Sequence, residues 1–170
     1  KITGATRYNI EYNYRSRSQW RIDRGRRQLI ITVRYQRIDW EPKHVIWLRD
    51  MPPTQGFWSG QILRHEFDHV RISNDPRMGK RFQELLREQA VFRHDLKPGE
   101  TVNSAKVEQL VEQHVESIFQ ELADLISIRY VELDRETNHG AVKLPATSKL
   151  FPLLRGDEPK SDDSATANSN

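Results

Sequence analysis

Two histidines four residues apart flank a glutamate in the segment His65-Glu66-Phe67-Asp68-His69. On a helix this spacing places both imidazoles on one face, one turn apart. Such a pair suits a single zinc ion, which binds imidazole nitrogen at about 2.0 to 2.1 Å. Glu66 follows the first histidine, where its carboxylate can take a proton from a water molecule that attacks a carbonyl. The segment predicts a zinc-dependent hydrolase, and we expect it to cleave peptide bonds.

A catalytic zinc site needs a third protein ligand, and the chain has no cysteine to supply it. Asp75 lies six residues beyond the motif, the offset used by metzincin proteases, which this stretch resembles in spacing only. Ile72 stands where those proteins have a glycine that turns the chain toward the metal. His114 is a second candidate, on the apolar stripe of a predicted helix, with Glu112 and Glu116 nearby as possible carboxylate ligands.

His139 is the third candidate, and it lies just beyond that helix in Asp134-Arg135-Glu136-Thr137-Asn138-His139-Gly140. Here the chain resembles an uncharacterised bacterial family of predicted secreted zinc-dependent proteases. In that family an HExxH helix and a long helix precede a segment of pattern Tyr-Asp-x-x-Thr-x-His-Gly. The resemblance extends over most of the chain, from Ile2-Thr3-Gly4 to this segment.

The resemblance implies a zincin-like fold, a Zn²⁺ cofactor, and a secreted or periplasmic location. It implies this catalytic site: His65, His69 and His139 as zinc ligands, and Glu66 as catalytic base. Asp134 would orient a ligating imidazole from behind, and Thr137 would shape the last turn. Leu133 replaces the tyrosine of the family pattern, so a phenol that could stabilise an oxyanion is missing there. Tyr130, one helical turn earlier, is either a hydroxyl near the site or a buried or half-exposed aromatic, and the second interpretation is favoured.

The first half of the chain predicts a small, mostly antiparallel sheet. Alternating or β-rich runs predict strands at Tyr8–Tyr14, Gln28–Trp40 and His44–Leu48. The sequence Asp23-Arg24-Gly25-Arg26 is typical of a turn that pairs the flanking strands antiparallel. A free edge of this sheet could bind an extended peptide by strand addition.

Helical periodicity follows a proline-containing loop at 51–56. It predicts a motif helix from Phe57 to about Asn74, a second helix from Arg77 to about Val91, and a long helix from Ser104 to about Leu133. We therefore expect an α+β fold, with the sheet packed on the motif helix and the long helix. Residues 1–155 would form one zincin-like catalytic domain, and 156–170 a disordered tail.

Composition leaves two alternative functions open. The charged fraction is 30%, and no apolar run approaches the roughly 20 residues that span a bilayer. The first alternative is a zinc-stabilised binding module without catalysis. The second is a nucleic-acid-binding domain, because the first third is rich in arginine: Arg15, Arg17, Arg21, Arg24, Arg26, Arg27, Arg34 and Arg37. We expect these arginines to form a solvated face of the sheet. The expected partner is a peptide or protein substrate rather than a nucleic acid.

Overall fold

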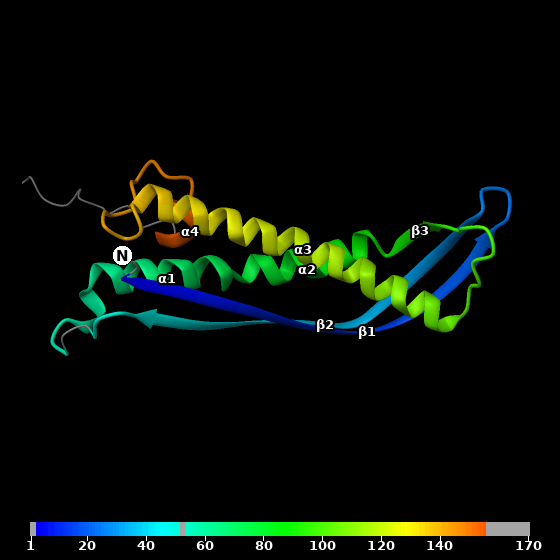
Figure 1. The fold of residues 1–170 in the computed structure, drawn as a ribbon, viewed down its shortest axis with the longest axis horizontal. Coiled ribbons are helices and arrows are strands. Elements are labelled where there is room, and N and C mark those ends of the chain that lie inside the picture. Colours follow the sequence, from blue (N-terminus) through cyan, green and yellow to red (C-terminus); the bar gives the residue numbers. More distant parts are fainter. Residues whose placement is uncertain (1–2, 52–53, 156–170) are drawn as a thin grey trace, which may run out of the picture.

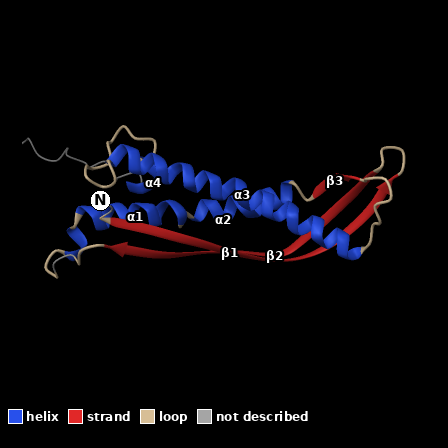
Figure 2. Cartoon of the chain, viewed as in Figure 1, coloured by secondary structure: helices blue, strands red, loops and turns tan. Residues whose placement is uncertain are grey.

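The computed structural model describes residues 3–51 and 54–155 of the chain. A long antiparallel hairpin of β1 (Gly4–Asp23) and β2 (Gln28–Leu48) runs the length of the molecule, with the helices along one face (Figures 1 and 2). A short strand, β3 (Val91–Asp95), pairs with β2 near the hairpin turn, giving the order β1-β2-β3. The fold is α+β with a three-stranded antiparallel sheet, which confirms the predicted fold class at this level.

The second strand is longer than predicted. The sequence predicts a break after Trp40, and this prediction is wrong because β2 continues through Pro42. The backbone N–H of Arg49 donates to the carbonyl oxygen of Thr3 (3.0 Å). This bond shows which of the alternating opposed pairs of the hairpin are hydrogen-bonded and which are not. By this alternation, Pro42 and its partner Ile10 form a non-hydrogen-bonded pair. The missing N–H of proline therefore faces away from β1, on the side where no described strand pairs with this part of β2.

The helical part follows the prediction in outline. Its elements are η1 (Phe57–Ser59), α1 (Gln61–Ser73), α2 (Pro76–Glu88), α3 (Ser104–Thr137) and α4 (Phe151–Arg155). Asp75 caps α2 by accepting from the backbone N–H of Arg77 (3.0 Å), and Asn103 caps α3 in the same way. Two predicted ends are wrong: α2 ends before β3, and α3 runs on past Leu133, taking Thr137 into its last turn.

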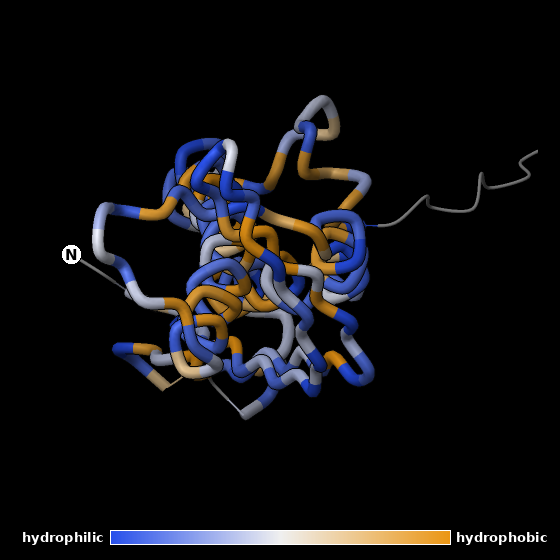
Figure 3. The backbone as a smooth tube through the Cα atoms, turned by 90° about the vertical axis from the view of Figure 1, so that its right-hand side faces the viewer, coloured by the Kyte–Doolittle hydropathy of each residue, from blue (hydrophilic) through white to orange (hydrophobic). Residues whose placement is uncertain are grey.

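The hydrophobic core lies between the hairpin and the helices. Viewed along the molecule, many of its apolar positions gather toward the centre (Figure 3). Its fully buried members come from β2, α1, α2 and α3: Leu29, Ile31, Ile72, Phe82, Leu86, Val107, Val115, Ile118, Ile126 and Leu133. This core fixes α1 and the C-terminal half of α3 against each other. No helix in the described ranges is both long and apolar enough to cross a membrane, and the predicted tail, 156–170, lies outside them.

Candidate metal centre

The last turns of α3 meet the motif helix α1 at one end of the molecule (Figure 1). There the described residues contain one group that could hold a metal ion, made of His65, His69 and Asp134. The two imidazole Nε2 atoms lie 3.2 Å apart. Asp134 Oδ1 lies 3.0 Å from Nε2 of His65 and 3.1 Å from Nε2 of His69. Both histidines are buried, whereas the Asp134 side chain is one-third exposed.

The three donor atoms have the spacing of a tetrahedral site. Ligands held about 2.0 Å from a metal at tetrahedral angles lie about 3.3 Å from one another. The three observed separations, 3.0 to 3.2 Å, come within a few tenths of an ångström of that value. Two imidazole nitrogens and one carboxylate oxygen are also a donor set that zinc accepts. The residues present therefore fit a metal ion of this kind.

Thr137 determines which nitrogen of His65 carries the proton. Its hydroxyl lies 2.7 Å from the carbonyl oxygen of Leu133, which can only accept, so the hydroxyl proton is directed there. The same oxygen lies 3.2 Å from His65 Nδ1 and must accept a hydrogen bond from it. A neutral His65 is thus protonated on Nδ1, and its unprotonated Nε2 faces His69 Nε2 and Asp134 Oδ1.

This tautomer leaves an electrostatic conflict that a cation would relieve. The lone pair of His65 Nε2 faces the carboxylate oxygen of Asp134 at 3.0 Å, with no proton between them in the neutral imidazole. Burial lowers the pKa of His69, the nearby His65 lowers it further, and Asp134 opposes the shift. A lowered pKa favours the neutral imidazole, which is the form that binds metals.

Glu66 lies beside this group and is held by the first strand. Thr6 Oγ1 donates to Glu66 Oε2 at 2.6 Å. Gly4 leaves room for the carboxylate, since a Cβ at Gly4 would lie 2.6 Å from Glu66 Oε1. Burial raises the pKa of Glu66, and the hydrogen bond from Thr6 partly opposes this shift. The carboxylate is thus a positioned base with an affinity for protons above that of an exposed glutamate.

A pocket of about 480 Å³ opens over the group, lined by Gly4, Thr6 and Tyr130 as well as the donors. The Tyr130 ring packs on His69 with centroids 4.3 Å apart. Its hydroxyl is 2.8 Å from Ser73 Oγ, and burial raises its pKa to about 12. Tyr130 is therefore a wall of the pocket, and its predicted hydroxyl is already engaged with Ser73.

His139 lines the same pocket but stands outside the donor group. Its Nδ1 lies 3.6 Å from Asp134 Oδ1, and its side chain is 80% exposed. The backbone from Asn138 to Gly140 has positive φ at all three residues, which turns the chain back over the motif helix. A Cβ at Gly140 would lie 2.9 Å from the Cβ of His65, so only glycine fits that turn.

The other two predicted third ligands lie elsewhere. Asp75 caps α2, and its carboxylate pairs with Arg77 at 2.9 Å. His114 Nε2 is 2.9 Å from the carbonyl oxygen of Gln89, and its ring stacks on Phe92. Both residues have structural partners that account for them, and neither joins the donor group of the described chain.

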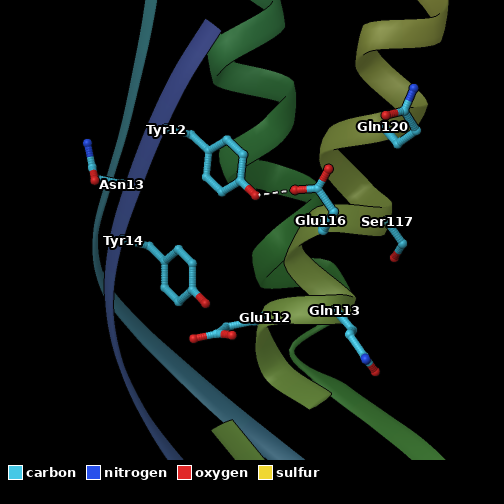
Figure 4. Close-up of a pocket in the computed structure, with 8 residues that line it drawn as sticks. All are labelled: Tyr12, Asn13, Tyr14, Glu112, Gln113, Glu116, Ser117 and Gln120. Carbon is cyan, nitrogen blue, oxygen red and sulfur yellow. Dashed lines mark hydrogen bonds between the residues drawn. The ribbon is translucent and has the colours of Figure 1, made fainter. Parts of the chain in front are cut away.

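Glu112 and Glu116, the predicted carboxylate alternatives, line a separate open groove between β1 and α3, of about 920 Å³ (Figure 4). Tyr12 donates from its hydroxyl to Glu116 Oε2 at 2.5 Å. This bond joins β1 to α3, and neither carboxylate belongs to the group that could hold a metal ion in the described chain.

The sequence predicts Asp134 behind a ligand, whereas the structure groups it with the two histidines as a side chain that could itself hold a metal ion. The signal was available, since Tyr130, Asp134 and Thr137 are spaced four and three residues apart and so share one helical face. No pattern in the sequence around Thr6 and Gly4 indicates a role in the site, because these residues lie near Glu66 only after the chain has folded. In comparisons with known proteins, no family model, curated protein or solved structure matches this chain.

Proposed function

We propose that this protein is a zinc-dependent hydrolase with a zincin-like catalytic domain, and that it cleaves peptide bonds. The observation that carries the proposal is the group of His65 Nε2, His69 Nε2 and Asp134 Oδ1, 3.0 to 3.2 Å apart, beside Glu66, whose carboxylate accepts a 2.6 Å hydrogen bond from Thr6. We assign His65, His69 and Asp134 as the residues that would hold the ion. A zinc ion bound there would supply Lewis acidity, polarising a substrate carbonyl and acidifying water.

Glu66 is the proton carrier of the proposal. The hydrogen bond from Thr6 occupies Oε2 and leaves Oε1, on the side of Gly4, available to accept a proton. A buried carboxylate with a raised pKa can take that proton and then give it to the leaving amine. A metal-stabilised binding module would have no use for this carboxylate, which argues for hydrolysis over the non-catalytic alternative.

The edge of β1 is the proposed substrate platform. Thr3 and Arg49 form a hydrogen-bonded pair, so the main-chain groups of Gly4 and Thr6 point away from β2. β1 is an edge strand of the sheet, and this stretch lines the pocket. An extended peptide pairing with it would lie across the mouth of the pocket, with specificity set by alternate side chains.

The test combines metal content with hydrolysis. Elemental mass spectrometry should find about one zinc per chain in the parent, and loss of zinc in H65A and D134A, each checked for folding by circular dichroism. E66Q should keep its zinc and lose hydrolysis of a peptide library. A parent that binds no zinc when supplied with it, or an E66Q variant as active as the parent, would refute the proposal.

H139A separates the two assignments of the third ligand. Retention of zinc in H139A would support Asp134, whose oxygen is within 3.1 Å of both histidines. Loss of zinc in H139A with retention in D134A would instead favour the ligand set implied by the family resemblance.

A further inference from the structure

The face of the hairpin that points away from the helices carries four arginines in two directly opposed pairs. Arg15 lies opposite Arg37, and Arg17 lies opposite Arg34, in the register of β1 and β2. All four side chains are exposed, and we call this surface the arginine face. Like charges directly opposite each other on a sheet are destabilising. The fold therefore places positive charge where it costs stability.

An irregularity in β2 produces one of these pairs. Regular alternation would turn Arg37 to the same side as the inward-facing Tyr35. The register shifts between Arg15 and Ser16, so that Gln36 is an extra residue and Arg37 joins the outer side. The side chain of Arg37 is accordingly 75% exposed. The bulge thus brings a fourth guanidinium into the cluster.

Little on this surface neutralises the charge. Within the described ranges, Arg37 pairs with Asp39 at 2.7 Å, and the other three arginines have no ion pair. The neighbouring outer pairs are Asn13 with Asp39 at one end and Gln19 with Thr32 at the other, so Asp39 is the one acidic side chain among them. Strand spacing of about 4.8 Å and a repeat of about 6.6 Å along each strand hold the four arginines in one compact array.

We propose that the arginine face binds the phosphate backbone of a double-stranded nucleic acid. Guanidinium groups pair with phosphate oxygens in a bidentate way, and a duplex presents the dense line of phosphates that opposed arginines require. Aromatic side chains for stacking bases are absent from the positions named above, which favours a duplex over a single strand. Large apolar side chains are absent there too, so the surface lacks what a membrane-binding face inserts into lipid.

The proposed duplex site shares no residue with the metal centre. Its affinity for a duplex should fall steeply as the salt concentration rises. Four phosphate contacts give a slope of log affinity against log salt near −3.6, which weakens binding about 150-fold between 50 and 200 mM salt. The variant R17Q/R34Q removes both arginines of one opposed pair and leaves Arg15 and Arg37 in place. It should lower the slope by about 1.8 and weaken binding about 60-fold near 0.1 M salt.

The experiment is fluorescence anisotropy of a labelled 20-base-pair DNA duplex of arbitrary sequence, titrated with the full chain. K80Q/R87Q is the matched control, because it removes the same charge from exposed positions of α2, a helix that covers the other face of the hairpin. It should bind nearly as tightly as the parent. R17K/R34K should keep the salt slope.

Folding of R17Q/R34Q is checked by its thermal midpoint, which should not fall, since a repulsive pair is removed. E66Q should bind the duplex as the parent does, whatever its hydrolytic activity. The proposal is overturned by a parent that does not bind the duplex at 50 mM salt, by equal affinities of R17Q/R34Q and K80Q/R87Q, or by tighter binding to phosphatidylglycerol vesicles than to the duplex.

Discussion

Replacing Thr137 with valine is the most direct test of how the metal centre is prepared. Valine keeps the shape of threonine and removes an oxygen that receives hydrogen bonds from His65 Nδ1 and Gly140 N, both at 3.2 Å. Loss of such a partner behind a ligating histidine lowers metal affinity by about 10- to 100-fold. That range corresponds to about 1.4 to 2.7 kcal/mol. The buried Nδ1–H left without an acceptor should also destabilise the metal-free protein by about 1 to 3 kcal/mol.

The assay is zinc competition against a chromogenic chelator, together with urea unfolding of the metal-free protein. T137S is the control, because serine keeps the acceptor, and its zinc affinity should stay near that of the parent. Nitrogen NMR of the parent should find the proton of neutral His65 on Nδ1. If T137V binds zinc within about twofold of the parent and unfolds at the same urea concentration, the tautomer assignment at His65 is wrong.

Three further outcomes are expected. In G4A the added Cβ would lie 2.6 Å from Glu66 Oε1, so hydrolysis should fall about 100-fold while zinc content, measured on the same sample, is retained. In R155M the buried Asp68 loses two 2.7 Å hydrogen bonds and keeps its pair with Arg71, so urea unfolding should show a loss of about 2 kcal/mol. Glu100 has a pKa of about 2, lowered by hydrogen bonds from the Lys97 backbone, Lys106 and His94. Its stabilisation is present above the usual pKa of 4.5 and is lost as pH falls toward 2, so the thermal midpoint of E100Q should be below that of the parent at pH 6 and equal to it near pH 2.

The sequence predicts the parts of this fold whose signals are local. The turn after Asp23 and the β-rich runs on either side are enough to predict the antiparallel hairpin. The long apolar stripe without glycine or proline is enough to predict most of α3. Strand β3 was missed because five residues directly after a helix carry too short an alternation to be distinguished from its last turn.

The metal centre divides in the same way. His65, Glu66 and His69 form a motif that can be read within one helical turn and a half. The spacing that places Asp134 on one face with Tyr130 and Thr137 applies only if the helix is known to continue to Thr137. Helix ends are hard to locate when the last turn continues into residues that also suit a loop. Thr6 is sixty positions away from Glu66 in sequence, and no pattern within either segment indicates that they meet.

The antiparallel return of α3 along α1 determines when the centre can exist during synthesis. A nascent chain that has emerged as far as α2 already carries the two histidines and the glutamate, but not Asp134. Because domains fold as their chain becomes available, the donor group is completed only after the whole of α3 has left the ribosome and docked. A ribosome-bound chain that ends before Asp134 would therefore lack the third of these side chains. Any activity that depends on the metal would be confined to chains whose synthesis has passed that point.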